Sequence, residues 1–206
     1  MVLENRFNKL IEARHGTILY NKNDIYIGKS IEKYGEFSYL EAKIFEQICK
    51  DGDVVIEVGA NIGAHTLYLS KLVGNGYVFA FEPQRLVFQN LCANLALNSI
   101  SNVFAYQEAV SNENGTIIIP ECNFKENNNF GGINIENTKN GTTVNKQKLD
   151  NFLNKIDRLK LLKIDVEGME ISVIKGASEL IKKFRPMIYV ENDRQEHSKE
   201  LIELLW

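Results

Sequence analysis

The stretch VIEVGANIG, residues 55–63, decides the fold of this chain. An apolar strand runs into glycines and from there directly into a helix, which the apolar pattern of residues 64–73 predicts. Glycine lets the backbone approach a ligand closely at the carboxyl end of a strand, where open α/β sheets bind cofactors. The stretch therefore predicts an open α/β sheet with a cofactor site at this turn.

Strands and helices alternate along the chain on both sides of this stretch. Because short apolar strands separated by helices pair in parallel through right-handed crossovers, we expect a mostly parallel sheet. The predicted fold class is α/β, with a doubly wound, Rossmann-like sheet. We expect strands over residues 53–58, 77–81, 103–107, 159–164 and 187–190, and helices over residues 38–49, 64–73, 86–98 and 170–184.

One structural domain accounts for the whole chain, because 206 residues are enough to bury a single core. We expect residues 1–50 to pack on an α/β domain of residues 51–206. Residues 111–150, rich in Asn, Gly and Thr, interrupt the alternation and are too long for a plain connection. We expect a functional excursion or partial disorder there. Short β-like pieces within it are predicted at residues 116–119, 133–136 and 142–145.

The N-terminal residues carry three local signals. Mixed charged and apolar residues predict a short amphipathic helix over residues 1–14. The alternating segments 17–20 and 24–28 predict a β-hairpin. Ser38, with Glu41 three residues later, predicts the N-cap and capping box of the following helix.

Composition limits the partners and the compartment. The net charge is −3, so no basic field favours nucleic acid as a partner. The three cysteines lie far apart without metal-ligand spacing, which is typical of a reducing compartment. The N-terminus lacks the apolar core of a signal peptide, and no apolar run reaches the roughly 18 residues that span a bilayer. We therefore expect a soluble, cytoplasmic protein without nucleic-acid or membrane partners.

The glycine spacing distinguishes between two kinds of cofactor. A dinucleotide site needs a second glycine where this chain has Asn61, so that a pyrophosphate can reach the helix N-terminus. Glu57 at the strand end repels phosphate and attracts an ammonium group. The spacing of Gly59 and Gly63 therefore favours a cofactor with an amino-acid moiety, although a plain αβ turn with packing glycines would give the same pattern.

Two further strand ends supply polar groups at the same edge of the sheet. Glu82, in FAFEP at residues 79–83, follows the glycine loop by about 20 residues and is placed to accept both ribose hydroxyls of an adenosine. Pro83 fixes the turn after it. Glu108 follows the third strand, where a polar group can contact an adenine amino group, although polar residues commonly follow strands.

Carboxylates gather after the last two strands. Asp165 ends the fourth strand, Glu167 and Glu170 follow within one turn, and Glu191 ends the fifth strand. Acids so close together repel one another unless they are partnered, which indicates a base or a cation-binding group. Helix capping is the ordinary alternative, and it accounts best for Glu170. His65, just inside the first helix, is interpreted as a surface or packing residue.

Several short motifs occur in order along most of the chain: Gly35 with Glu41, residues 52–63, Phe81-Glu82-Pro83, residues 94–98, Ala109-Val110-Ser111 before Gly115, Leu149-Asp150, residues 162–170 and Lys175-Gly176-Ala177. Together they resemble the FkbM family of methyltransferases. The resemblance implies a class I methyltransferase fold with S-adenosyl-L-methionine as cofactor. It further implies methyl transfer to a hydroxyl oxygen of a small-molecule or carbohydrate acceptor, such as a sugar or a polyketide-type product.

The resemblance also implies the cofactor contacts and one departure. The family fold usually adds a final antiparallel strand pair, for which this sequence shows no counterpart, so the fifth strand would be an exposed edge. Either the sequence is truncated, or a partner, such as a second copy in a homodimer, or the N-terminal hairpin covers that edge. The resemblance implies that the methionine end of the cofactor is held by Glu57, Gly59, Asn61 and Gly63. Glu82 would bind the ribose, and Glu108 and Ala109 would lie near the adenine. The predicted cofactor-binding set is completed by Ala60, Thr66, Pro83 and Gln84.

The predicted reaction is a direct displacement, in which the protein aligns the acceptor oxygen, the methyl carbon and the sulfur. Asp165 is the predicted base, and Glu167 or Glu191 is the alternative. A divalent cation held by these three carboxylates is a minor alternative, so no metal is predicted.

Two other classes of function are weighed against this one. A nicotinamide-dependent oxidoreductase is disfavoured by Asn61 and Glu57. A non-catalytic, eroded cofactor-binding domain is favoured by the short C-terminus and opposed by the intact glycine loop and Glu82. A nucleic-acid methyltransferase is weaker still, because the chain has neither the Asp/Asn-Pro-Pro-Tyr motif nor a Pro-Cys nucleophile.

Overall fold

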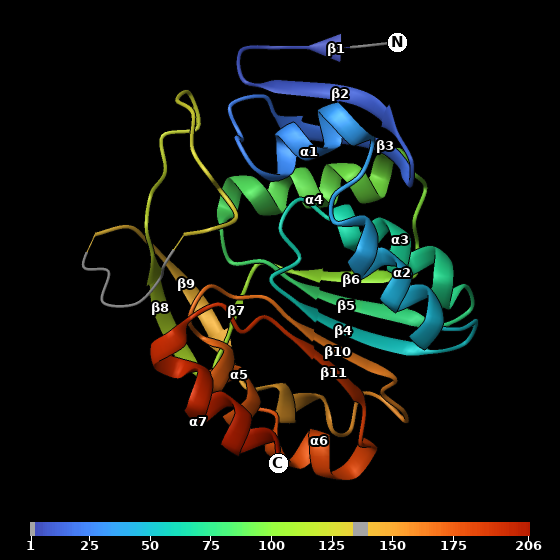
Figure 1. Cartoon of the computed structure of the whole chain (residues 1–206), viewed down its shortest axis with the longest axis vertical. Coiled ribbons are helices and arrows are strands. Elements are labelled where there is room, and N and C mark those ends of the chain that lie inside the picture. Colours follow the sequence, from blue (N-terminus) through green and yellow to red (C-terminus); the bar gives the residue numbers. More distant parts are fainter. Residues whose placement is uncertain (1–2, 134–139) are drawn as a thin grey trace.

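A five-stranded parallel sheet forms the centre of the computed structural model, which describes residues 3–133 and 140–206 (Figure 1). The strand order is β11-β10-β4-β5-β6, so the order reverses between β4 and β10, and ligands of open α/β sheets bind at such a switch point. All five predicted strands and the doubly wound α/β class are confirmed. The strands are β4 (Val54–Val58), β5 (Tyr77–Phe81), β6 (Val103–Tyr106), β10 (Leu161–Ile164) and β11 (Met187–Val190).

Helices cover both faces of this sheet (Figure 1). One face carries α2 (Tyr39–Ile48), α3 (Ala64–Val73) and α4 (Arg85–Leu97), and the other carries the 3₁₀ helix η1 (Leu149–Phe152), α5 (Glu170–Lys175), α6 (Ser178–Phe184) and α7 (Gln195–Leu205). No helix in the described part of the chain is long and apolar enough to cross a membrane.

The central strand β4 is buried along its whole length. Ile56 packs on the η1, α5 and α6 side, and Val55 packs on the α2 and α3 side, as alternation along a strand requires. A strand covered on both faces is normally apolar throughout. Glu57 is the exception in β4, and its carboxylate points to the side of α3, where it meets Thr66.

The N-terminal residues form an antiparallel sheet of β1 (Leu3–Glu4), β2 (Asn8–Ala13) and β3 (Gly16–Asn21). The helix predicted over residues 1–14 is therefore wrong. The hairpin predicted from segments 17–20 and 24–28 is also wrong. Segment 17–20 lies in β3, but β3 pairs with β2, and helix α1 (Ile27–Tyr34) begins within the predicted second strand.

A tertiary contact explains this difference. The fully buried side chain of Asn94 on α4 accepts a hydrogen bond from the backbone N–H of Leu19 at 2.6 Å and donates one to the Leu19 carbonyl at 3.0 Å. The amide thus acts as a strand partner for β3, because it satisfies both backbone groups of one residue. The local pattern around Leu10 and Ile11 fits a helix and a strand alike, and the contact with α4 selects the strand.

The predicted excursion forms a small sheet of β7 (Ala109–Val110), β9 (Thr142–Gln147) and β8 (Gly115–Ile119). The strands predicted at residues 116–119 and 142–145 are confirmed, and most of residues 133–136 lies outside the described residues. Between β8 and β9 the chain returns to the N-terminal sheet, where Phe130 is buried and stacks on Phe124 at 4.6 Å. This return carries the following residues, Gly131 and Gly132, to the edge of the central sheet.

The single helix predicted over residues 170–184 is divided into α5 and α6. A Cβ on Gly176 would lie 2.0 Å from the carbonyl oxygen of Ser111, so this turn depends on a close approach of two distant segments. The carboxylate of Asp150 accepts the backbone N–H of Leu180 at 2.9 Å and thereby satisfies a free donor at the start of α6. The backbone donor at the start of α6 is therefore satisfied by a side chain of η1, and not by a capping residue of α6 itself.

Candidate functional site

The glycine loop between β4 and α3 adopts left-handed backbone conformations. Gly59, Asn61 and Gly63 have φ angles of 84°, 51° and 86°. A Cβ on Gly59 would lie 1.7 Å from the backbone oxygen of Asp165, and one on Gly63 would lie 2.7 Å from Leu91 Cδ1. Both glycines thus allow close packing of the loop, which holds the ends of β4 and β10 together.

Glu82 links the glycine loop to the end of β5. Its Oε2 accepts the backbone N–H of Asn61 at 3.1 Å, and its Oε1 accepts that of Gln84 at 2.8 Å. The side chain is 3% exposed, and burial raises its pKa to about 7, although the two N–H groups oppose this shift. Each oxygen keeps a lone pair, so the carboxylate is held in place and can still accept two hydroxyl donors.

Glu57 lies in the wall of the same cavity. Its Oε2 accepts the hydroxyl of Thr66 at 2.6 Å, and its Oε1 lies 3.8 Å from the Nζ of Lys163. Burial raises the pKa of Glu57 to about 7, while Lys163 and Thr66 lower it. Thr66 therefore acts by orienting Glu57, and it is not itself part of the cavity wall.

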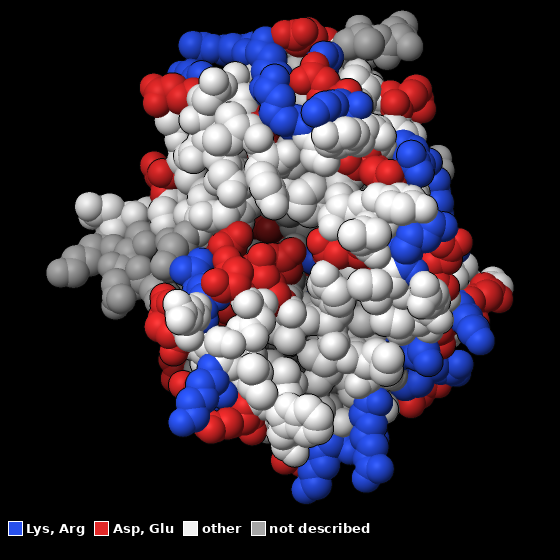
Figure 2. Space-filling model, in the orientation of Figure 1, with Lys and Arg blue, Asp and Glu red and all other residues white. Residues whose placement is uncertain are grey.

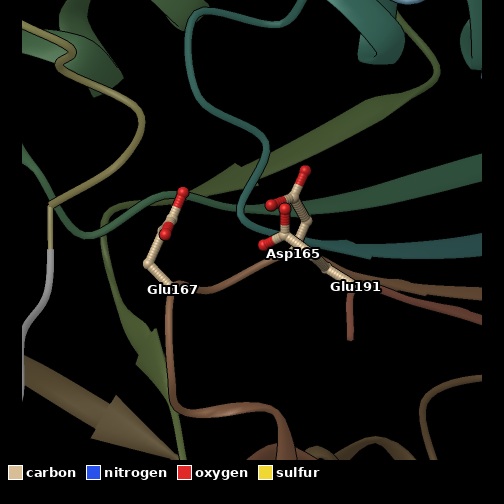
Figure 3. A group of neighbouring side chains, drawn as sticks. All are labelled: Asp165, Glu167 and Glu191. Carbon is tan, nitrogen blue, oxygen red and sulfur yellow. The ribbon is translucent and has the colours of Figure 1, made fainter. Parts of the chain in front are cut away.

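The three predicted catalytic acids meet at the ends of β10 and β11 (Figure 3). One carboxylate oxygen of each of Asp165, Glu167 and Glu191 lies within 4.8 Å of the others. In Figure 3 the carboxylates of Asp165 and Glu191 lie close together, and Glu167 reaches toward the cavity from the loop after β10. The predicted clustering of these side chains follows from parallel strands that end at the same edge of a sheet.

Each acid of this cluster has a different electrostatic environment. Asp165 Oδ2 accepts a hydrogen bond from Lys163 Nζ at 3.2 Å, and Glu167 Oε2 accepts one from Arg194 Nη2 at 3.1 Å. Glu191 has no cationic partner among the described residues, and its buried Oε2 accepts no hydrogen bond there. Burial and the charges of Asp165 and Glu167 raise the pKa of Glu191 to about 8.

Glu170 takes the structural role predicted for it. Its carboxylate accepts the backbone N–H of Gly168 at 3.1 Å and that of Val166 at 3.3 Å. This caps the turn that leads into α5. Glu167, with a φ of 55°, is instead turned into the cavity wall.

A cavity of about 130 Å³ connects the glycine loop with the acid cluster. Figure 2 shows acidic side chains gathered around a hollow in this face of the molecule. Its wall contains six carboxylates and, among the described residues, one lysine. The charged residues of the wall are Glu41, Glu57, Glu82, Asp165, Glu167, Glu191 and Lys163.

The sequence did not indicate several residues of this wall. His65 is 5% exposed, and its ring lies 5.5 Å from Phe37 and 5.3 Å from Phe45. Burial, and secondarily the charge of Lys163, lowers its pKa to about 3, so the imidazole is neutral. The position of His65 directly after the glycine loop was the available signal. Asn129 and the two glycines at 131 and 132 come from the excursion and carry no such signal.

Some predicted cofactor residues lie outside this cavity. Gln84 and Pro83 line a neighbouring pocket of about 200 Å³ between the β5 turn and the excursion. Glu108 accepts a hydrogen bond from the amide of Gln147, and Ala109 is buried in β7. Gln84 also donates to the carbonyl of Phe130 at 2.9 Å, which ties the excursion to the turn after β5. The adenine contacts assigned to this region stay predictions.

The sheet order, the glycine loop and Glu82 at the end of the next strand define a class I methyltransferase domain. The fold is shared with the solved structure of a precorrin 8w decarboxylase from Methanobacterium thermoautotrophicum, with a TM-score of 0.51 and 15% identity, covering 89% of this chain and 77% of that one. The sequence profile of the methyltransferase FkbM domain matches residues 57–205, and the chain belongs to this family.

Two curated relatives are also methyltransferases. The methyltransferase sdnD of Sordaria araneosa is 28% identical, and the match covers 70% of each chain. The hexuronic acid methyltransferase AglP of Haloferax volcanii is 27% identical, and the match covers 65% of this chain and 53% of that protein. The predicted family is thereby confirmed, and with it S-adenosylmethionine, the cofactor of this family.

The residues of the cavity fit this cofactor. S-adenosylmethionine carries a sulfonium and an ammonium charge, and the acidic wall is complementary to both. The same wall would repel a pyrophosphate, and Asn61 occupies the position that a dinucleotide needs as glycine. Glu57 would face the amino-acid end of the cofactor, and Glu82 would accept hydroxyl groups of its ribose.

Proposed function

We propose that this protein transfers the methyl group of S-adenosylmethionine to a hydroxyl oxygen of a small-molecule or carbohydrate acceptor. The observation that carries the proposal is the cluster of Asp165, Glu167 and Glu191 beside the cofactor turn. Carboxylates accept hydrogen bonds from hydroxyl groups, and one of them can remove a hydroxyl proton. The name of the hexuronic acid methyltransferase AglP supports a sugar as the acceptor.

The proposal gives Asp165 and Glu191 different roles in the reaction. When bound, S-adenosylmethionine supplies a methyl group that is already activated, so the protein has to orient the acceptor and take up a proton. Asp165 accepts this proton, because Lys163 holds one of its oxygens and the other accepts no hydrogen bond from the described residues. Glu191, with its raised pKa, is mostly protonated near pH 7 and donates a hydrogen bond to an acceptor oxygen.

Calorimetric titration and an acceptor screen test the proposal. We expect the purified chain to bind S-adenosylmethionine and its demethylated product in the micromolar range and not to bind NAD. A panel of neutral sugars, uronic acids and hydroxylated small molecules is then incubated with the cofactor, and a mass gain of one methylene unit identifies the acceptor. Cofactor binding without transfer to any hydroxyl acceptor would contradict the proposal and favour a non-catalytic domain.

Cofactor affinity is expected to rise with pH. Burial raises the pKa of Glu82 from its ordinary value to about 7, and ribose hydroxyls donate to the ionised form. Binding therefore favours loss of the proton. The ionised fraction of a group with a pKa near 7 rises about tenfold between pH 6 and pH 8, so the Kd should fall roughly tenfold over the same range. Titrations of wild type and Glu82→Gln at both pH values check this. The variant should bind more weakly and lose the part of the pH dependence that comes from Glu82, while Glu57, whose pKa is also about 7, still contributes its own part. An unchanged dependence in Glu82→Gln would assign all of it to another group.

Turnover is expected to survive removal of divalent cations. Lys163 and Arg194 already balance two of the three clustered carboxylates, and protonation can neutralise Glu191. A hard cation prefers oxygen ligands of this kind, so the alternative has a direct test. The turnover rate is measured after exhaustive EDTA treatment and again after addition of Mg²⁺ or Mn²⁺. A loss that the cation restores would make the cluster a metal site.

A further inference from the structure

Lys163 is a buried cation in the middle of an apolar strand. It is 1% exposed, and its neighbours Leu162 and Ile164 on β10 are fully buried. Moving an ammonium group out of water costs several kcal/mol unless opposite charges and hydrogen bonds offset the loss. The partners of this side chain therefore determine what it does.

Two carboxylates with different roles share the ammonium group. Lys163 is the register partner of Glu57 on β4, and Nζ lies 3.8 Å from Glu57 Oε1. The same Nζ donates to Asp165 Oδ2 at 3.2 Å. Glu57 belongs to the cofactor loop and Asp165 to the acid cluster, so one side chain joins the two halves of the cavity.

The charge balance of the cavity requires this cation. Burial alone lowers the pKa of Lys163, but the carboxylates of Asp165, Glu57 and Glu41 raise it overall, so the group stays charged. The wall holds six carboxylates and no other lysine or arginine among the described residues. Folding stability alone does not require Lys163 and its carboxylate partners, because apolar residues of similar volume often replace buried ion pairs without loss of stability.

We propose that Lys163 is a positioning residue of the transfer reaction. Its ammonium group fixes one oxygen of Asp165 and leaves the other available to the acceptor, while it balances Glu57 in the cofactor loop. Without it, the charge of Glu167 pushes the Asp165 carboxylate out of its position. The inference rests on the proposed function, since it gives Asp165 the role of base.

A double-mutant cycle tests the inference in the full chain. Lys163→Met keeps the length of the side chain and removes its charge, and we expect kcat to fall roughly 10- to 100-fold, as displacement of a catalytic group by about 1 Å does. The acceptor KM and the calorimetric Kd for the demethylated cofactor should change less than about threefold. In an Asp165→Asn background the same substitution should lower kcat less than about twofold, because the two residues act as one unit.

Two controls distinguish a positioning role of Lys163 from an effect of its substitution on folding. Lys160→Met, at an exposed position three residues earlier, should leave kcat and unfolding temperature unchanged. If Lys163→Met fails to fold, Glu57→Gln with Lys163→Met removes both buried charges, and the cycle is repeated on that background. Equal losses of kcat in the presence and absence of the Asp165 carboxylate would overturn the inference, as would an unchanged kcat in Lys163→Met.

A structural readout decides the inference without any acceptor. In a crystal structure of Lys163→Met with the demethylated cofactor, the Asp165 carboxylate should leave the position it has in wild type. An Asp165 side chain that keeps its rotamer would overturn the positioning role. Failure of wild type to methylate any acceptor would instead contradict the proposed function, so the two failures are distinguishable.

Discussion

Asp165→Asn should lower kcat roughly 10²- to 10⁴-fold, the usual contribution of a general base. The substitution keeps the shape of the side chain and removes its ability to take up the hydroxyl proton. The Kd for the demethylated cofactor should change less than about twofold, because Glu57 and Glu82 lie on other strands. Steady-state kinetics with the identified acceptor and calorimetry with the cofactor product measure the two quantities.

A matched variant controls for the loss of one negative charge. Asp157→Asn changes an exposed aspartate whose one ion pair within the described part of the chain is with Arg158, and it should leave kcat unchanged. Full turnover in Asp165→Asn would move the proton-accepting role to Glu191, which lies beside it at the end of β11. In that case Glu191→Gln, and not Asp165→Asn, would show the large loss of kcat.

The central sheet could be predicted because its strands carry their own signals. Each is a short apolar run bounded by turn residues, and parallel pairing brings their carboxyl ends to one edge. That rule places Glu57, Glu82 and Asp165 together before any coordinates are known. Their side-chain chemistry and the strand order together define the site.

The N-terminal sheet could not be predicted, because its determinants lie in other elements. The strand β3 depends on the amide of Asn94, which is 75 residues distant from Leu19 in the sequence. The break between α5 and α6 depends in the same way on the contact between Gly176 and Ser111. Local periodicity contains neither contact, so it predicts one helix where tertiary structure has two.

Two parts of the site were missed for a related reason. Lys163 looks like an ordinary strand residue in the sequence, and only the register of β10 with β4 brings it against Glu57. Asn129 reaches the cavity because the excursion folds back on the turn between β3 and α1, where the backbone N–H of Ile25 donates to the carbonyl of Asn128 at 3.0 Å. Long-range returns of this kind leave no periodic pattern.

Gly59→Ala should destabilise the protein more than any other single alanine substitution in the glycine loop. The residue has a φ of 84°, which costs an L-residue about 1–2 kcal/mol, and the added Cβ would lie 1.7 Å from the carbonyl oxygen of Asp165. To relieve this contact, β4 and β10 have to move apart at the centre of the sheet. Overpacking of a core adds about 1–3 kcal/mol, so we expect a total loss of about 2–5 kcal/mol and an unfolding temperature lower by roughly 10 °C.

Gly52→Ala separates the two causes of this loss. Gly52 has nearly the same φ, 85°, but no heavy atom lies within 4 Å of its added Cβ. It should therefore lose only the conformational part, about 1–2 kcal/mol, and keep its cofactor affinity. Thermal unfolding of both variants gives the loss of unfolding free energy in each. The difference between the two losses measures the contribution of the close approach of the two strands alone. Equal unfolding temperatures would mean that the glycine loop relaxes without moving β10, and Gly59 would then be required for its backbone conformation rather than for the strand contact.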